Sequence, residues 1–354
     1  MISPVIPCAT GGGLAMRAFQ TLRAFATQYE ITLLVPDFGY SHQSLTTNIT
    51  LISGKIAHYD LNPYRDLPTL AQSICYRAFP RIYFSLYAKP SDWRFINRRR
   101  IAKVCASYSN EYFDLIHIHR LYMTPFAQPF LDNSSASLVQ LDLDDIESVT
   151  RFRIGELYRL NGKYRQERIM KIDARQYSKI ERTLLPRFDR VFVCSETDKE
   201  KLISIYNCRT IEVIPNTVNI GPARERCSNS DIFTLLFVGT FSYYPNQDGI
   251  HFFCHNVLPL IRKSSPKRFQ VKIIGRNMPV SLAKQLKQFP EVELLGWVDN
   301  LQSFYQDSDA IIVPIRAGGG TRIKILEAFS YQRPVITTSM GVEGIAAEDG
   351  KEIL

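Results

Sequence analysis

The sequence predicts an α/β protein made of two doubly wound domains. Strand-like apolar runs alternate with helical patterns along almost the whole chain. The alternation stops once, in a polar stretch over residues 217–231, and then restarts. The 354 residues are also enough for about two domains of ordinary size. We therefore expect an N-terminal domain over residues 1–216, a linker over 217–231 and a C-terminal domain over 232–354. The two domains would face each other across a cleft, which is the expected active site.

The composition is that of a soluble globular protein, with 45% hydrophobic and 22% charged residues. No apolar run approaches the roughly 20 residues that span a bilayer, and the N-terminus lacks a signal-peptide pattern. The seven scattered cysteines have no paired metal spacing and are expected to be reduced. These features predict a cytoplasmic protein. The net charge of +9 favours anionic partners, which could be nucleic acid, an acidic lipid surface or a phosphorylated substrate.

The first domain begins with a βαβ pattern. Residues 1–7 predict a short first strand, residues 14–28 a helix and residues 31–35 a second strand. The loop between the first strand and the helix ends in Gly12 and Gly13, and it could face a phosphate. The glycines could equally do no more than permit a tight turn between strand and helix.

Residues 93–103 predict a basic helix that contains aromatic side chains. We favour a solvated helix face over a nucleic-acid-binding arm, because the basic residues alternate with apolar ones at amphipathic spacing. The functional alternative is a face that touches anionic lipid at the inner surface of the membrane. The basic residues are dispersed over both domains and no nucleic-acid module is present, so we expect no nucleic-acid partner.

Residues 113–119 predict a strand that ends in His119, where ligands bind in parallel sheets. We expect a role in the site for His119 and a packed, hydrogen-bonded position for His117. The next strand, residues 137–142, leads into four acidic side chains that could bind a divalent metal ion. Helix capping and pairing with the arginines that follow is the favoured alternative; the acids are Asp142, Asp144, Asp145 and Glu147.

The remaining elements complete the two domains. Residues 146–185 predict a long, solvated helical excursion that is rich in charged side chains. The rest of the first domain is predicted as a strand over residues 190–195, a helix over 196–206 and a strand over 211–215. In the second domain, strands are expected over residues 235–239, 271–275 and 292–295, and helices over 248–262, 282–289 and 301–305.

The stretch from Ala310 to Thr338 holds the strongest local signal. A buried strand over residues 310–315 leads through three glycines into a helix that starts near Thr321, and another strand begins at Val335. A glycine loop at a helix N-terminus binds anions through free backbone N–H groups and the helix dipole. Arg322 and Lys324 add two cations to a turn where cations are normally disfavoured. This placement predicts a phosphate site.

The residues resemble a known family, the GT-B glycosyltransferases of glycosyltransferase family 4 (glycosyl transferases group 1). The similarity covers nearly the whole chain and is strongest over residues 235–338. It includes the Phe-Val-Gly-Thr run at 237–240, the Leu-Gly-Trp-Val run at 295–298 and the Pro-Ile-Arg-Ala-Gly-Gly-Gly-Thr-Arg run at 314–322. The last of these and the acidic run near Asp145 are similar to a bacterial subgroup tied to polysaccharide assembly. The fold implied is two Rossmann-like domains.

The resemblance implies a retaining transfer of a sugar from a nucleotide diphosphate donor to a saccharide or lipid-linked acceptor. Arg322 and Lys324 would neutralise the diphosphate, so that no bound metal ion or other cofactor is expected. Glu327 would hold the ribose hydroxyls, and His119 would lie near the donor sugar. The other donor-binding positions implied are Gly12, Gly13, Gly239, Thr240, Trp297, Val298, Gly319, Gly320 and Thr321.

The chain departs from the family pattern in four places. Gly319 stands where the first of two glutamates is usual, and residues 239–246 lack the usual Arg and Lys. Thr217 replaces the glycine of the Pro-Asn-Gly motif. The terminal helices that would follow Leu354 are missing, so we expect a fragment of a longer protein. Two alternatives to glycosyl transfer remain: a sugar-nucleotide epimerase of the same fold, and a non-catalytic sugar-nucleotide-binding protein.

Overall fold

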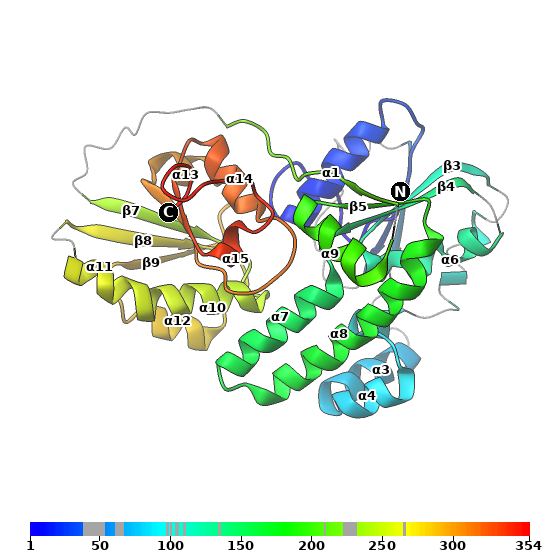
Figure 1. Cartoon of the computed structure of the whole chain (residues 1–354), viewed down its shortest axis with the longest axis horizontal. Helices are drawn as coiled ribbons and strands as arrows, with labels where there is room; N and C mark the ends of the chain where they lie inside the picture. The colour runs from blue at the N-terminus through cyan, green and yellow to red at the C-terminus, as the bar shows by residue number, and fades with distance from the viewer. Residues whose placement is uncertain are drawn as a thin grey trace. The chain divides into compact units, whose positions relative to one another are not determined.

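The computed structural model describes residues 1–37, 54–60, 67–96, 99, 101–102, 106–108, 111–133, 136–208, 210–221, 232–264 and 267–354. The chain forms two compact units, Met1–Pro215 and Asn216–Leu354 (Figure 1). In both, the paired strands are parallel, so the α/β class predicted from the alternating pattern is confirmed.

The sheet of the first unit has the strand order of a doubly wound fold. Ile2 bridges to Leu34 on one side and to Ile118 on the other, which inserts the short first strand between β1 and β3. From one edge to the other the order is therefore β2, β1, the short strand at Ile2, β3, β4, β5 and β6. The strands are β1 (Thr32–Asp37), β2 (Lys55–Asp60), β3 (Phe113–His119), β4 (Ala136–Asp144), β5 (Arg190–Val193) and β6 (Ile211–Val213).

Helices bury both faces of this sheet. Leu22 of the first helix packs against Leu33 and Val35 on one face. Leu34, Ile118 and the interior of the later strands form the larger core on the other. The helical segments are α1 (Gly13–Phe25), α3 (Leu67–Ala78), α4 (Pro80–Tyr87), η2 (Ser91–Phe95), η3 (Leu121–Met123), α6 (Thr124–Asn133), α7 (Glu147–Leu160), α8 (Tyr164–Leu184), η4 (Leu185–Arg187) and α9 (Glu196–Tyr206).

Two helical predictions in this unit need correction. The helix expected over residues 93–103 begins as the short 3-10 turn η2 and is interrupted at Ile96, whose backbone is extended. Arg94 packs over the ring of Phe95 at 4.0 Å instead of pointing into solvent. Several of the cations on which the membrane prediction rested, Arg98, Arg100 and Lys103, lie outside the described residues.

The helical excursion over residues 146–185 is a hairpin of two helices, α7 and α8 (Figure 1). Asn161 and Gly162 end the first helix, because Gly162 adopts the left-handed conformation (φ +69°) that glycine accepts at a helix C-terminus. The hairpin is also less solvated than predicted, since Asp173, Tyr177 and Glu181 are fully buried in it.

The second unit repeats the doubly wound order. Its sheet runs β11-β10-β7-β8-β9, and Ile353 adds a parallel bridge to Val335 at the outer edge. Figure 1 shows α10, α11 and α12 on one face of the sheet and α13 and α14 on the other. The bounds are β7 (Phe233–Val238), α10 (Tyr244–Phe252), a π-helical turn (Phe253–Val257), α11 (Leu258–Ser264), β8 (Phe269–Ile274), α12 (Val280–Leu286), β9 (Val292–Gly296), α13 (Gln302–Asp307), β10 (Ala310–Val313), α14 (Ile323–Ser330), β11 (Val335–Thr337) and α15 (Ser339–Val342).

No helix in the described part of the chain is both long enough and apolar enough to cross a bilayer.

Candidate functional site

The candidate site of the second unit lies at the carboxyl ends of β7 and β10. These neighbouring strands are the ones between which the strand order reverses, and ligands of doubly wound sheets bind at that point. The loop after β7 begins with Gly239 and Thr240. The loop after β10 contains the three glycines and leads to α14. The fold thus brings the two segments of the predicted phosphate site to one edge of the sheet.

Close backbone contacts fix these loops. A Cβ atom at Gly275 would lie 1.8 Å from the carbonyl oxygen of Gly239, so only glycine fits where the β8 loop passes the β7 loop. Gly318 has φ +134°, and a Cβ atom there would lie 2.7 Å from the hydroxyl of Tyr243. The backbone conformation and the close packing at Gly318 therefore require glycine at this position of the loop.

Arg322 is the N-cap residue of α14 rather than part of its first turn. Its Nη1 donates to the carbonyl oxygens of Gly319 and Gly320, so the guanidinium folds back over the glycine loop. Nη2 is buried and has no hydrogen-bond partner among the described residues. A buried N–H donor without a partner costs about 1–3 kcal/mol, and an anionic oxygen would remove that cost.

Lys324 lies in the first turn of α14 and is held by Asn246. Its Nζ donates to Asn246 Oδ1 at 3.0 Å, and Asn246 Nδ2 donates to the carbonyl oxygen of Thr240 at 2.8 Å. Asn246 thus connects the β7 loop to the start of α14. Burial, with the nearby positive charge of Arg322, lowers the pKa of Lys324 to about 7. A second negative group beside this amine would raise the pKa again.

Glu327 lies one turn further along α14. One carboxylate oxygen accepts a hydrogen bond from the hydroxyl of Tyr305 at 3.1 Å, and the Tyr305 ring stacks on Tyr331. Burial raises the pKa of Glu327, whereas the Tyr305 hydroxyl and the Lys324 ammonium lower it. The carboxylate keeps acceptor capacity for a ligand, since an ionised carboxylate has about four lone-pair sites.

Three further predicted positions lie on the same edge of the sheet. Thr321 Oγ1 accepts a hydrogen bond from Asn216 Nδ2 at 2.7 Å, which connects the glycine loop to the segment that opens this unit. Trp297 follows β9 and is half-exposed, and the guanidinium of Arg276 lies 3.3 Å from its ring centroid. Val298 packs into the core with the α14 residue Ile325.

In the first unit, α1 connects the glycine loop to His119. Gly12 is the N-cap residue of α1, and a Cβ atom there would meet nothing within 4 Å. Arg17 of α1 is buried and donates from Nε and Nη2 to the carboxylate of Asp142, at 2.8–3.0 Å. Asp142 Oδ2 lies 3.3 Å from Nδ1 of His119. His119 itself has no exposed surface, so the ring is part of a buried ion-pair cluster.

Asp142 is held ionised. Its burial alone would raise the carboxyl pKa, but the Arg17 guanidinium and His119 together hold it far below its usual value. His117 is also buried, and burial lowers its pKa to about 3, so it is neutral near pH 7. His117, His119 and Asp142 have ligand atoms within 4.8 Å of one another. Because Arg17 already neutralises Asp142, this geometry favours an ion pair over a metal centre.

The other acidic residues of this run pair with arginines, but the favoured interpretation is right only in part: the N-cap residue of α7 is apolar, and the main partner precedes the acids along the chain. Arg120 contacts Asp144, Asp145 and Glu147, and Arg151 also approaches Glu147. Arg151 further binds Asp92, at 2.6 Å, which ties α7 to the η2 turn. The acids serve as partners for buried guanidinium groups.

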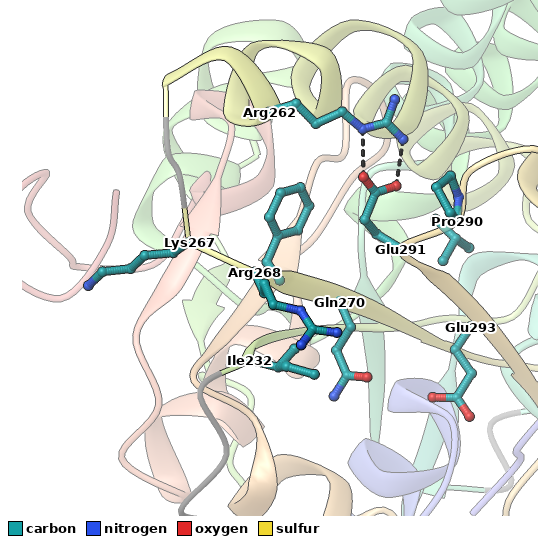
Figure 2. A pocket seen from close by; sticks show the side chains of 10 residues that line it. Ile232, Arg262, Lys267, Arg268, Gln270, Pro290, Glu291 and Glu293 are labelled. Carbon is teal, nitrogen blue, oxygen red and sulfur yellow. Dashed lines mark hydrogen bonds and ion pairs between the residues drawn. The ribbon is translucent and has the colours of Figure 1, made fainter.

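Figure 2 shows a pocket of about 720 Å³ in the second unit. Its wall includes Ile232, Phe269 and Val292, which lie at the amino ends of β7, β8 and β9. Arg262 and Glu291 form a bidentate ion pair at its edge. The pocket lies at the end of the sheet opposite to the predicted site, where doubly wound folds do not place their ligands.

Residues 232–354 match the family model described as glycosyl transferases group 1. We call these residues the group 1 part. A curated relative, an uncharacterized 44.6 kDa protein in the cps region of Klebsiella pneumoniae, is 25% identical over 129 residues. The match spans 34% of this chain and about a third (32%) of the relative's length. The sequence resemblance is thereby confirmed over the group 1 part.

The similarity to solved structures covers both units. The HepE protein of Anabaena, in complex with UDP-glucose, aligns over 100% of this chain and 85% of its own, with a TM-score of 0.62 and 14% identity. A trehalose-6-phosphate structure from E. coli, bound with UDP-2-fluoro glucose, aligns over 100% and 86%, with a TM-score of 0.61 and 14% identity. TarM aligns over 73% and 48%, with a TM-score of 0.54 and 12% identity. The fold is the GT-B fold.

Sequence reasoning missed four residues that position the group 1 site and the first-unit cluster. Asn246 and Tyr305 hold Lys324 and Glu327, Arg276 covers Trp297, and Arg17 neutralises Asp142. Only Arg17 left a signal, since it adjoins the apolar stripe of its helix. The others come from loops and helices distant in sequence, so their contacts depend on the fold.

Proposed function

We propose that this protein is a retaining glycosyltransferase that moves a sugar from a nucleotide diphosphate donor to a saccharide or lipid-linked acceptor. The observation that carries the proposal is the arrangement of Arg322, Lys324 and Glu327 at the sheet switch point of the group 1 part. Two cations stand beside a glycine loop, and a carboxylate stands one helical turn further on. A nucleotide diphosphate has the matching groups, two phosphates followed by a ribose with two hydroxyls.

Arg322 and Lys324 are proposed to stabilise the leaving diphosphate. The buried Nη2 of Arg322 lacks a partner, and the lowered pKa of Lys324 means that the ammonium gains from a nearby anion. Negative charge grows on the leaving phosphate as the glycosidic bond breaks, so fixed cations favour the transition state over the ground state. In this proposal the reaction uses the chain's own cations and no metal ion.

The donor and the stereochemistry are proposed from the structural neighbours. HepE was solved with UDP and glucose, and a trehalose-6-phosphate synthase study describes glycosyl transfer with retention. Gly239, Thr240, Gly319, Gly320, Thr321, Trp297 and Val298 are proposed to surround the donor. From the first unit we propose Gly12 and Gly13, where no internal contact demands glycine at Gly12. His119 is proposed near the donor sugar, a contact that requires its buried ring to become exposed.

The acceptor is proposed to belong to cell-surface polysaccharide synthesis in a bacterium. The support is the curated relative, which is described as lying in a cps region. We also propose that the protein works in the cytoplasm, at the inner face of the membrane, where lipid-linked acceptors would be available.

The test is nucleotide release from a panel of UDP- and GDP-sugars, measured with the purified chain and with Lys324→Met as the matched control. We expect one nucleotide class to be released by the wild-type chain and at least a tenfold lower rate in the variant. If no nucleotide binds and none is released, the proposal is wrong.

One observation favours a second candidate, a non-catalytic sugar-nucleotide-binding protein. Gly319 stands where the family usually has a glutamate, so a side-chain contact to the donor sugar is missing. Tight nucleotide binding without turnover, also in a chain extended to its full length, would support this candidate over the transferase.

A further inference from the structure

Helix α3 exposes two of its large apolar side chains to solvent. Its buried residues are the hydroxyl-bearing Thr69 and Ser73, whereas Leu67 and Ile74 are 80% and 56% exposed. Helices on soluble proteins normally bury the apolar stripe and expose the polar one. Two large apolar side chains of α3 thus lie outside the side that packs on the protein, which points to a partner on the outer side of the helix.

Helix α4 continues the same exposed surface. It is joined to α3 through the exposed Phe79, and Ile82 and Leu86 stand at helical spacing on its outer side. The inner side is well packed, with Tyr83 and Phe84 buried. We define the α3–α4 face by its exposed large apolar side chains, which are Leu67, Ile74, Phe79, Ile82 and Leu86.

The turn between α7 and α8 lies next to this face. Arg165, near the start of α8, donates from Nη2 to the carbonyl oxygen of Ala78 at the end of α3, at 3.4 Å. Leu160 and Tyr164 on either side of that turn are 70% and 61% exposed. Apolar exposure thus extends from the two short helices to the adjoining hairpin.

The charged side chains of α3 and α4 themselves are all positive. Residues 67–91 contain Arg77, Arg81 and Lys89 and no acidic residue. Arg77 and Arg81 are exposed, as are Lys163 and Arg165 at the hairpin. Apolar side chains among cations on short helices suit an interface that has acyl chains below and anionic head groups around them. At 12 and 8 residues the helices are too short to span a bilayer.

We propose that the α3–α4 face binds the surface of a bilayer that contains anionic lipid. Leu67, Ile74, Phe79, Ile82 and Leu86 enter the acyl boundary, while Arg77 and Arg81 contact lipid phosphates. This places the membrane contact on helices other than the basic segment over residues 93–103. It is independent of the proposed glycosyl transfer, because no residue of the face belongs to the nucleotide site.

The experiment is flotation of the full chain with two kinds of vesicle. One kind is phosphatidylcholine alone, and the other also contains roughly 30–40% phosphatidylglycerol, which makes it strongly anionic. We expect binding to the anionic vesicles at low salt and none to the neutral ones. Ile82→Ser with Leu86→Ser should weaken binding on the order of tenfold or more, because it removes two apolar side chains that the bilayer would bury. Arg77→Gln with Arg81→Gln should weaken it about 25-fold, at about fivefold for each cation.

Matched controls in the second unit change exposed aliphatic and cationic side chains elsewhere. Leu260→Ser with Val280→Ser removes two side chains that are also exposed, and Lys284→Gln with Lys287→Gln removes two exposed cations. Both should bind vesicles like the wild type. Equal losses in test and control variants would overturn the assignment of the face, and no flotation at low salt would overturn the membrane contact.

Two readouts separate the alternatives. The first readout is the oligomeric state, measured by light scattering. If the wild type is a dimer and the double variant Ile82→Ser with Leu86→Ser is a monomer, a second copy covers the face and the proposal is overturned. Leu86→Trp should give a blue-shifted emission only with anionic vesicles. Nucleotide release by the α3–α4 variants should match the wild type without vesicles, so a failed membrane proposal remains distinguishable from a failed transferase proposal.

Discussion

Among single residues, Lys324 is a buried amine whose protonation should change when an anionic ligand binds beside it. Burial and Arg322 lower its pKa to about 7, while Asn246 provides only a neutral acceptor. A folded pKa below the unfolded value means that the amine destabilises the protein while it is charged, and that this cost disappears as pH rises from about 7 to about 10.5. A bound diphosphate would supply the missing negative charge.

UDP binding should therefore take up a proton. At pH 8 most of the free protein carries neutral Lys324, and the bound form should carry the ammonium, so we expect an uptake of about 0.9 proton per UDP. Calorimetry in buffers of different ionisation enthalpy measures this number. Lys324→Met should bind UDP more weakly with no uptake, and wild-type binding without uptake would contradict the assigned contact.

Glu327 tests the ribose contact. Replacement by Gln keeps the shape and removes the charge, so UDP affinity should fall on the order of 10–100-fold. The same variant should no longer distinguish UDP from 2′-deoxy-UDP, because the hydroxyl contact is what it has lost. Tyr305→Phe removes the residue that orients Glu327 and should cost less. A full preference for UDP in Glu327→Gln would show that the ribose lies elsewhere.

The Arg17–Asp142 pair tests buried charge in the first unit. Arg17→Met leaves the Asp142 carboxylate buried and unpaired, which should lower the free energy of unfolding by about 3–5 kcal/mol. Arg17→Met with Asp142→Leu removes both charges and should recover much of the loss. Urea unfolding measures both. If the single variant is as stable as the wild type, the pair does not hold α1 on the sheet.

At the scale of elements, the α7–α8 hairpin is attached through polar contacts. Asp173 of α8 accepts hydrogen bonds from the backbone N–H and hydroxyl of Ser91, at 2.8 and 2.6 Å. Tyr177 and Arg151 both bind Asp92 of the same turn. The hairpin is thus fixed to η2 by a buried network, and the adjoining α3–α4 pair depends on that position.

This network predicts a pH dependence. Burial raises the pKa of Asp173, and the positive charge of Arg151 lowers it. Burial has the larger effect, so the pKa is raised to about 6. With the folded pKa above the unfolded value of 3.8, Asp173 contributes stability below about pH 4 that is lost as pH rises through 6. Asp173→Asn stays neutral, so its stability relative to the wild type should rise between pH 4 and 6. Urea midpoints at pH 4.5 and 7 measure this, and a constant difference would contradict it.

At the scale of the whole molecule, each unit has its own core. Two apolar clusters fill the first unit and two others fill the second, on the two faces of each sheet. Residues 216–354 alone should therefore fold and unfold cooperatively, and they should bind UDP more weakly than the full chain if Gly12 and Gly13 contribute. Thermal unfolding and calorimetry of this piece test both points. A piece without a cooperative transition would mean that its core is incomplete.

The order of strands and helices could be predicted from the sequence, because apolar periodicity and glycine positions are local properties of the chain. It also placed Arg322, Lys324 and Glu327 together, since all three lie within two turns of one helix start. The pairing of Glu147 with Arg151 could be predicted for the same reason, because the two lie one helical turn apart, whereas the pairing of Asp145 with Arg120 could not.

The fold was needed to show which distant residues support that site and which surfaces remain exposed. Asn246 reaches Lys324 across 78 positions, and Arg17 reaches Asp142 across 125. Such pairs follow from strand order in the sheet, not from spacing along the chain. The exposed apolar side chains of α3 were equally hidden, because periodicity marks an apolar stripe but does not say whether the fold buries it. Burial is a property of the packed molecule, so it is decided by the fold.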